Sequence, residues 1–220
     1  MLAALPRAVL SRVARKLRSV PLELGQVLHE PGARMRHVYF PTGAMVSLVT
    51  VANGGKVLEV GLVGPQGMVG VSLVLGFSAS PVRAIAQSAG SALRMSAPAF
   101  VAELKRNRRL HREALRFAHV SMVTAMHIAA CNLAHTLEAR LARWLLMTRD
   151  CLRTETFLLT QEFLAQMLGV RRSGVSEVAR RLQQSGLIRY SRGKIIIVDG
   201  AGLRASACGC YENIRKLTDR

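Results

Sequence analysis

Residues 159–198, LTQEFLAQMLGVRRSGVSEVARRLQQSGLIRYSRGKIIIV, decide the fold of this chain. Apolar residues recur there at steps of three and four, which predicts a first helix that Thr160 can cap with its hydroxyl and that Gly169 ends. A second apolar stripe over residues 175–182 predicts another helix. After it, two short strands can pair around a tight turn at Ser191-Arg192-Gly193. The order of helix, turn, helix and basic hairpin is a winged helix-turn-helix pattern.

The outer faces of this stretch carry the chemistry that DNA binding needs. A helix fits the major groove, where side chains near its N-terminal end reach base edges while hydroxyls, arginines and wing residues hold phosphates. Between residues 171 and 194, seven basic residues stand against one acid. The outward residues predicted for the second helix and the wing are Arg171, Arg172, Ser173, Ser176, Glu177, Arg180, Arg181, Arg192 and Lys194. The alternative interpretation is a three-helix packing module with a solvated charged face.

The composition also favours an anionic partner. Of the 220 residues, 50% are hydrophobic, enough to bury a sizeable core in one large or two modest domains, and the formal net charge is +18. The excess is not confined to the winged stretch, because residues 1–137 carry +11 and residues 138–220 carry +7. Basic runs at residues 7–18 and 105–116 either offer a dimer further surfaces for flanking DNA or serve solubility alone.

Nothing in the sequence predicts export or a membrane span. The first 20 residues contain five Arg or Lys at helical spacing, so they hold no uncharged signal core. The most apolar long run, residues 118–137, carries three histidines and an asparagine, which favours a buried helix over a bilayer span. Four cysteines are too few for a secreted disulfide scaffold. We therefore expect a cytoplasmic protein with no membrane partner.

Residues 22–95 are typical of short strands separated by glycine, proline and asparagine turns. The alternating or β-branched runs are residues 38–40, 46–51, 57–63, 68–75, 84–87 and 92–95. The sharpest turn signals are Asn53-Gly54-Gly55 and Gly64-Pro65-Gln66-Gly67. This pattern predicts a compact antiparallel roll or barrel, preceded by a short basic helix over residues 6–18.

A helical period returns over residues 97–136, with Pro98 suited to the first turn. Residues 117–137 are apolar nearly all round, so this helix needs cover on two sides. The simplest arrangement packs one side on its own roll and the other on the same helix of a second protomer, in a two-fold contact. Polar residues at candidate seam positions leave the register open: Ser121, Asn132 and His135. A further helix over residues 137–152 has one apolar face formed by Leu141, Trp144, Leu145 and Thr148.

This order of roll, long helix and winged helix-turn-helix resembles the CRP/FNR superfamily of bacterial transcription regulators over nearly the whole chain. The matching residues are GQVLHEPG at 25–32, VYF at 38–40 with Gly43, and LTQEFLAQMLGVRRSGVSEVARRLQQSGLI at 159–188. The last of these stretches is the specific one, because the earlier glycines alone would be a weak signal.

The resemblance implies an α+β fold with three parts. These are an N-terminal antiparallel β-roll of the cyclic-nucleotide-binding type over residues 1–102, a long dimerisation helix over residues 103–137, and a C-terminal winged helix-turn-helix domain over residues 138–220. It further implies a sequence-specific transcription regulator that binds double-stranded DNA as a homodimer on a near-palindromic operator and is modulated by an unidentified effector. RNA polymerase is a candidate partner.

The resemblance also assigns roles in the DNA-binding stretch. Thr160 matches the position where the family contacts a phosphate, and Arg172 matches an arginine that reads guanine in the cyclic-AMP receptor branch. Two positions depart, since Ser173 stands where the family usually has glutamate and Glu177 where it has arginine. Arginine on guanine and glutamate on cytosine are the ordinary chemistry of the groove, so the operator should differ. Ser176 matches a serine of the FNR branch and is a candidate base or thymine-methyl contact.

A small-molecule effector is the open question in the roll. The family binds cyclic nucleotides through a Gly-Glu pair on the ribose and an Arg-Ser pair on the phosphate, and Gly70 and Arg83 match two of these residues. Val71 replaces the glutamate and Ala84 replaces the serine, so the ribose acceptor and one phosphate donor are missing. Three interpretations stay open: a cyclic nucleotide, another small ligand, or none. An arginine here is more often exposed or paired with a carboxylate.

We expect no metal or other cofactor. No cysteine precedes Cys131, so an iron–sulfur cluster of the FNR kind is not expected. Cys208 and Cys210 fall on a terminal helix whose apolar face is typical of packing, and Cys131 and Cys151 are only distant candidates for completing a zinc site. Four histidines recur every eight residues but drift by about 80° at each step around a helix, so they are interpreted as core or dimer contacts: His111, His119, His127 and His135.

An enzyme is not predicted either. The sequence has no supported Ser/His/Asp or Cys/His arrangement and no phosphate-binding loop. A cupin-type metalloenzyme would need clustered ligands, and His29, Glu30 and His37 are too few. The runner-up interpretation is a ligand-binding module whose winged domain contacts a protein, or DNA without sequence specificity.

Overall fold

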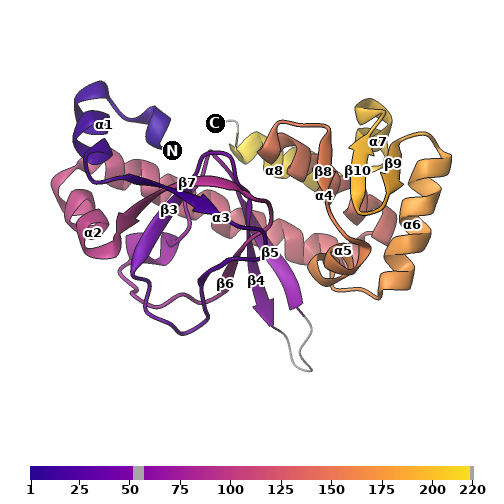
Figure 1. Cartoon of the computed structure of the whole chain (residues 1–220), viewed down its shortest axis with the longest axis horizontal. Helices are drawn as coiled ribbons and strands as arrows, with labels where there is room; N and C mark the ends of the chain where they lie inside the picture. The colour runs from indigo at the N-terminus through magenta and orange to yellow at the C-terminus, as the bar shows by residue number, and fades with distance from the viewer. Residues whose placement is uncertain (52–56, 219–220) are drawn as a thin grey trace. The chain divides into compact units, whose positions relative to one another are not determined.

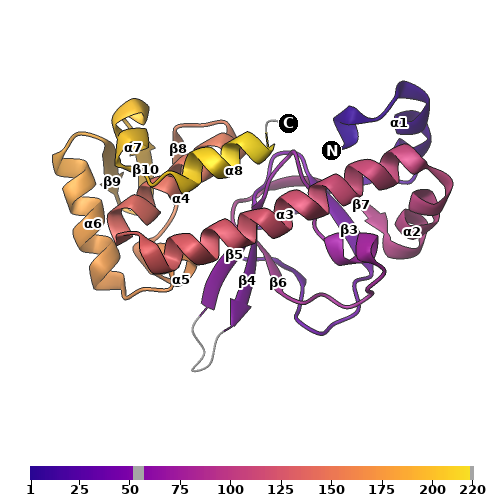
Figure 2. The same ribbon diagram turned by 180° about the vertical axis from the view of Figure 1, so that it is seen from behind.

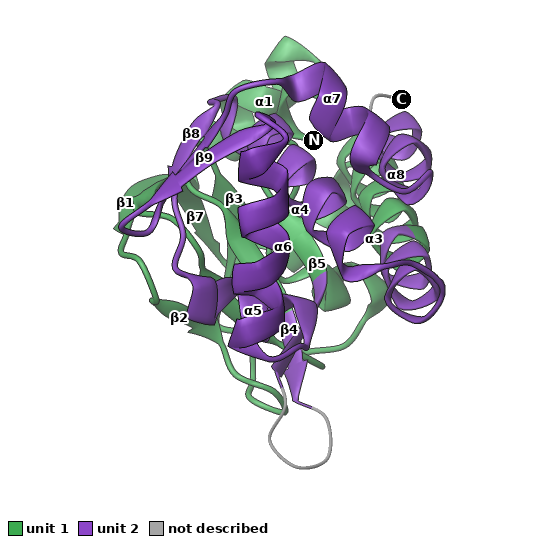
Figure 3. Ribbon diagram, turned by 90° about the vertical axis from the view of Figure 1, so that its right-hand side faces the viewer, with its two compact units in different colours: residues 1–48, 61–123 green, residues 49–60, 124–220 purple. Residues whose placement is uncertain are grey.

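The computed structural model describes residues 1–51 and 57–218, which form two compact units (Figure 1 and Figure 3). The first unit comprises residues 1–48 and 61–123, and the second comprises residues 49–60 and 124–220. The turn expected at Asn53-Gly54-Gly55 lies outside the described residues.

The roll is built from two sheets. The strands are β1 Arg18–Leu22, β2 Val27–His29, β3 His37–Pro41, β4 Val46–Val51, β5 Val57–Val63, β6 Arg83–Ala86 and β7 Gly90–Ser96. One sheet has the order β1-β7-β3 and the other the order β2-β6-β4-β5. Buried Val38 and Phe40 alternate with half-buried residues along β3 and join a core that includes Met95 and Phe100. The expected antiparallel roll is confirmed, as is the turn in which Gly67 N donates to Gly64 O at 2.9 Å.

Two parts of the roll differ from the prediction. The sequence does not predict β1 and β2, because both are short and mostly exposed and β1 contains Pro21. The strand predicted over residues 68–75 is wrong: Val69 makes one isolated bridge, and Val71–Leu75 is the 3-10 helix η2. Gly70 precedes η2 with φ +100°, a left-handed conformation that interrupts a strand and that glycine adopts without strain.

The N-terminal helix α1, Arg7–Ala14, is shorter than predicted because strand structure begins at Arg18; the 3-10 helix η1, Leu2–Ala4, precedes it. A buried carboxylate ties this region to α2, Ala97–Arg106. The Glu103 side chain is 0% exposed and accepts hydrogen bonds from Arg12 Nε at 3.1 Å and Lys16 Nζ at 2.7 Å. The hydrogen bond from Lys16 holds the pKa of Glu103 below its ordinary value.

The helical region after the roll is broken once. Pro98 lies in the first turn of α2 as predicted, but Asn107 leaves the helical conformation with φ −130° and ψ 98°. Its side-chain oxygen accepts from Arg109 N at 3.0 Å and Leu110 N at 3.1 Å, which caps the following helix. That helix, α3, runs without interruption over Arg108–Ala134 (Figure 2).

The second unit contains the winged stretch. Its elements are α4 Leu137–Leu152, β8 Thr156–Leu158, α5 Gln161–Leu168, α6 Arg172–Gln184, β9 Ile188–Ser191, β10 Lys194–Ile197, α7 Gly200–Ser206 and α8 Cys210–Thr218. The strands form a sheet of order β8-β10-β9, of which the sequence predicts β9 and β10 but not β8. The α4 face is confirmed, since Leu141, Trp144, Leu145 and Thr148 are all buried. The prediction of a single terminal helix is wrong, because α7 and α8 are two separate helices with a turn between them.

Candidate nucleic-acid interface

The two helices of the winged stretch form as the sequence predicts. Thr160 Oγ1 accepts from Phe163 N at 3.1 Å and caps α5, and Gly169 ends it with φ +64°. The buried side of α6 is the expected stripe of Val175, Val178, Ala179 and Leu182. Because this stripe is buried, the opposite side of α6 lies at the surface of the second unit (Figure 3).

The wing tip is held against the start of α5. Its two-residue turn uses Arg192 at φ 49° and Gly193 at φ 76°, and this positive-φ pair matches the twist of the flanking strands. Gly193 O accepts from Leu159 N at 2.6 Å, and Tyr190 OH donates to Leu159 O at 2.7 Å. Leu159 directly precedes Thr160, so these two bonds bring the wing turn beside the first helix.

Seven of the predicted DNA-contacting residues form one exposed set, here called the reading face. The reading face consists of Thr160, Arg171, Arg172, Ser173, Arg180, Arg192 and Lys194. Within the described ranges none of its five basic side chains forms an ion pair with a carboxylate. Unpaired cations and hydroxyls on a helix and an adjoining wing suit phosphate and base contacts.

The remaining two predicted residues, Ser176 and Glu177, have hydrogen-bond partners within the protein. Glu177 accepts from Arg181 Nη1 at 2.6 Å, and Arg181 Nε reaches Glu138 at 3.0 Å. The hydrogen bond with Glu138 raises the pKa of Arg181 above its ordinary value. Ser176 donates to Gln161 Oε1 at 2.5 Å, which joins α6 to the first turn of α5. These contacts position α6. The Glu177–Arg181 pair has the i, i+4 spacing that the sequence shows, whereas the contacts with Glu138 and Gln161 depend on the tertiary fold.

The structure brings the four predicted effector residues close together in the roll. Gly70 is within reach of His29, because a Cβ on Gly70 would lie 3.4 Å from His29 Cε1, and Ala84 is the strand partner of His29. Val71 and Arg83 are their chain neighbours. Arg83 Nε donates to Glu30 Oε2 at 2.8 Å, so an internal carboxylate meets the positive charge that would face a phosphate.

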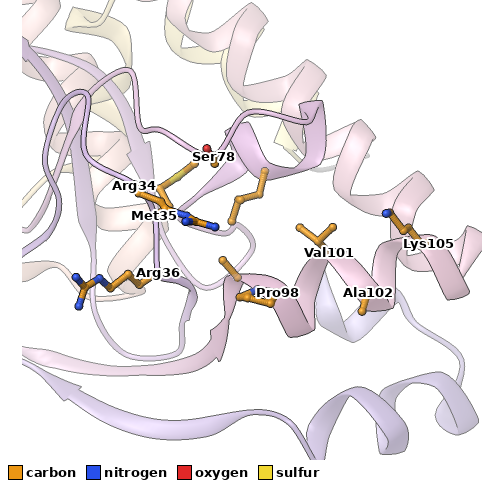
Figure 4. A pocket seen from close by; sticks show the side chains of 10 residues that line it. Arg34, Met35, Arg36, Ser78, Pro98, Val101, Ala102 and Lys105 are labelled. Carbon is orange, nitrogen blue, oxygen red and sulfur yellow. The ribbon is translucent and has the colours of Figure 1, made fainter.

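A separate pocket of about 760 Å³ opens on the first unit (Figure 4). It is lined by Arg34, Met35, Arg36, Leu73, Ser78, Ala97, Pro98, Val101, Ala102 and Lys105. None of the predicted effector residues is among them. The sequence gives no signal for this pocket, because its walls come from a loop, η2 and α2, which are far apart in the chain.

One group of potential metal ligands lies in the second unit. The ligand atoms of Cys131, His135, Cys208 and Cys210 all lie within 4.8 Å of one another. The expectation that Cys131 is distant from Cys208 and Cys210 is therefore wrong. The sequence signal that was overlooked is a Cys-x-x-x-His pair combined with a Cys-x-Cys pair.

The fold and the reading face define a winged helix-turn-helix DNA-binding protein that also carries an effector-type roll. Sequence-family comparison identifies a cyclic nucleotide-binding domain over residues 19–107 and a Crp-like helix-turn-helix domain over residues 139–206. The chain belongs to the CRP/FNR family of DNA-binding transcription regulators. This confirms the resemblance and the fold class that the sequence predicts. No curated protein sequence matches the chain.

Solved structures of this family share the fold at low identity. FixK2 from Bradyrhizobium japonicum is 13% identical with a TM-score of 0.75, over 88% of this chain and 98% of that one. TTHA1359, a CRP/FNR-family regulator from Thermus thermophilus, is 23% identical with a TM-score of 0.70, over 86% and 98%. The c-di-GMP-responsive regulator CLP from Xanthomonas campestris is 14% identical with a TM-score of 0.71, over 88% and 100%.

Proposed function

We propose that this regulator binds double-stranded DNA as a homodimer, with one α6 from each protomer in successive major grooves of a near-palindromic operator. The observation that carries the proposal is the reading face, in which the wing turn is fixed beside the start of α5 while the basic residues of α6 stay exposed. In a dimer the two recognition helices would lie about 34 Å apart along the DNA.

The reading face divides into two roles. Arg172, in the first turn of α6, is placed to read guanine through two parallel hydrogen bonds, with Arg171 and Ser173 beside it. Thr160, Arg180, Arg192 and Lys194 would hold phosphates and fix the register of the protein on the duplex. Ser176 and Glu177 act on α6 itself, because their side chains are bound within the protein, and their contribution to base recognition is correspondingly smaller.

The surface of α3 supports the proposed dimer and offers a candidate for the register that the sequence leaves open. One stripe of exposed residues on α3 advances by alternating steps of four and three: Leu115, His119, Met122, Met126, Ala129 and Leu133. Steps of four and three keep these residues on one face of the helix, as the seam of a two-stranded coiled coil requires. Exposure rises from 42% at Leu115 through 60% at Met126 to 91% at Leu133, which is unusual for large apolar side chains.

A second copy of α3 is the occupant that this stripe fits best. By length and composition α3 would also pass for a membrane-crossing helix, with 22% of its most apolar window buried. A membrane-spanning helix surrounded by lipid is not favoured, because Thr124, Ile128 and Cys131 on the other side of α3 are buried within the protein. A helix with one packed side and one exposed, largely apolar stripe needs only one further helix as cover.

No catalytic arrangement accompanies these surfaces in the part of the chain that the structure describes, and we propose a cytoplasmic regulator rather than an enzyme. Cyclic-nucleotide control is disfavoured, because Arg83 already has Glu30 as its counter-charge and Val71 and Ala84 lack the polar groups for ribose and phosphate. A different small effector and a contact with RNA polymerase would both be compatible with this role.

The decisive experiment is selection of bound sites from a random duplex pool at physiological salt, without added ligand. We expect a two-fold symmetric motif with half-sites one helical turn apart. Recovery of DNA with no shared motif would reject sequence-specific binding in the ligand-free state and would favour a ligand-binding module with a non-specific winged domain.

A matched pair of variants tests the dimer. Met122→Glu introduces a negative charge in the stripe. Arg116→Glu introduces a negative charge in place of a positive one at an exposed position of α3 outside the stripe. Sedimentation analysis should show monomers for Met122→Glu and dimers for the wild type and Arg116→Glu. If Met122→Glu stays dimeric, the α3 stripe is not the interface.

A further inference from the structure

The cluster of Cys131, His135, Cys208 and Cys210, here called the cysteine–histidine cluster, joins two distant parts of the second unit. Cys131 is in the last turn of α3, and His135 follows at the helical spacing of four, with its backbone N still donating to Cys131 O at 3.1 Å. Both side chains therefore point the same way. Cys208 and Cys210 lie at the turn into α8. Cys208 follows Cys131 by 77 residues in the chain.

The four donor atoms of the cluster lie close enough together to surround one ion, all within 4.8 Å of one another. Cys131 Sγ and Cys208 Sγ are 3.3 Å apart, and Cys210 Sγ is 3.8 Å from His135 Nδ1. Zinc holds sulfur at about 2.3 Å and imidazole nitrogen at about 2.0–2.1 Å, so the corners of a tetrahedron around it are separated by roughly 3.5–3.8 Å. The Cys210–His135 separation has this value and the Cys131–Cys208 separation is slightly shorter, so modest side-chain shifts would bring the four donors into a tetrahedral shell.

The charges around the cluster point to the same ligand. Arg140 and Arg143 of α4 are buried, 9% and 2% exposed, and Arg140 lies within electrostatic range of Cys131 and Cys208. Among the described residues the Nε atoms of both arginines lack a hydrogen-bond partner. Buried guanidinium groups need a nearby negative charge. Three thiolates and a neutral imidazole around a divalent cation carry a net charge of about −1, which supplies it.

We propose that Cys131, His135, Cys208 and Cys210 bind one zinc ion per protomer as a closed structural site. Three sulfurs and one nitrogen in tetrahedral order select zinc over the harder cations that prefer oxygen. All four positions are taken by the protein, so the metal has no open position for catalysis. This inference does not depend on the proposed DNA-binding role.

Such a site would act as a cross-link. It would fasten the end of α3 to the turn before α8 and so close a loop that contains α4, the reading helices and the wing. Closing a long loop restricts the unfolded chain, which stabilises the folded state. The winged part would then be clamped at both of its ends, next to the proposed dimer helix.

The first test is the zinc content of the full-length protein, purified without a metal-affinity step and measured by atomic emission. We expect one zinc per protomer in the wild type and less than about a tenth of that in Cys208→Ser and Cys210→Ser, because a closed site that loses a thiolate binds zinc far more weakly. Cys151→Ser is the matched control, since Cys151 is the fourth cysteine and lies in α4 outside the cluster. Zinc retention in the cluster variants at the level of the control would overturn the proposal.

A second test reports on geometry and does not require a folded cysteine variant. Cobalt(II) added to metal-stripped wild type should give the visible bands of a tetrahedral site and a thiolate-to-cobalt band in the near ultraviolet. His135→Cys should keep a four-ligand site and shift the visible bands, whereas His135→Ala should weaken cobalt binding by about tenfold or more. A wild type that binds neither metal, or that contains a Cys131–Cys208 disulfide when isolated anaerobically, would also overturn the proposal.

Discussion

The reading face and the first unit use the same kind of residue in opposite ways. On the reading face, arginines such as Arg171 and Arg172 are exposed and form no ion pair among the described residues. In the first unit, Arg83 of the roll is met by Glu30, and Arg12 and Lys16 converge on buried Glu103 of α2. A cation whose partner is internal contributes to the folded state, whereas one without an internal partner is left for a ligand. Substitutions should therefore separate into losses of stability and losses of affinity.

The largest expected effect is on stability. Glu103→Gln removes a buried charge that accepts hydrogen bonds from both Arg12 and Lys16, and it should lower the free energy of unfolding by roughly 1.5–3 kcal/mol. Denaturant titration of both proteins at neutral pH measures it. Affinity for the selected operator should stay within about twofold under conditions where the variant is folded; a large loss of affinity would blur the distinction between the two regions.

The same pair has a pH signature. The folded-state pKa of Glu103 lies below 4.5, so its contribution is fully present above pH 4.5 and is lost as the pH falls through the folded-state pKa. The stability difference between wild type and Glu103→Gln should therefore be constant near neutrality and shrink in acid. A difference that grows in acid would contradict this assignment.

The next effect is on specificity. Arg172→Ala should cost about 1–3 kcal/mol of binding free energy at one base position of the operator, with an unchanged unfolding midpoint. Fluorescence anisotropy with the selected operator and with single-base variants of it measures this. Equal losses on every sequence would remove Arg172 from base recognition and leave it as a phosphate contact.

A smaller and uniform effect is expected at the wing. Lys194→Ala should weaken binding to all duplexes similarly and reduce the slope of log affinity against log salt by about 1, because one phosphate contact is lost. Binding titrations of the wild type and Lys194→Ala at several salt concentrations measure this slope. A slope equal to that of the wild type would mean that the wing does not touch the phosphate backbone.

The smallest effect is expected in the roll. The side chains of Arg83 and Glu30, which form an ion pair, are 40% and 46% exposed, so Glu30→Gln should change the free energy of unfolding by less than about 0.5 kcal/mol.

Calorimetric titration of the wild type with cyclic AMP should show no binding. Tight binding by the wild type would show that the missing glutamate and serine are replaced by other groups, and the roll would then resemble the reading face.

Local patterns predict most of the second unit and much of the roll. The bounds of α4, the buried stripe of α6 and the wing turn follow from apolar periodicity and from glycines at residues 169 and 193, all of which act within a few residues. Asn107 is a capping residue type, but the basic residues on both sides of it continue the helical pattern, so the sequence does not predict the break there.

What the sequence does not reveal depends on contacts between distant residues. Arg83 and Glu30 are separated by 53 positions, and Cys131 and Cys208 by 77. No periodicity links such pairs, because their proximity is created by the tertiary fold. For the same reason the proposed seam on α3 can be identified only when the packed side of that helix is known.

The single tryptophan of the chain gives the second unit its own spectroscopic reporter. Trp144 is 2% exposed, and its indole Nε1 donates to Glu59 Oε1 at 2.9 Å, with both residues in the second unit. Unfolding of that unit would expose the indole to water and shift its emission to longer wavelength, while a change confined to the first unit would leave the emission unaltered. Fluorescence and circular dichroism recorded together would thus show whether the two units melt as one.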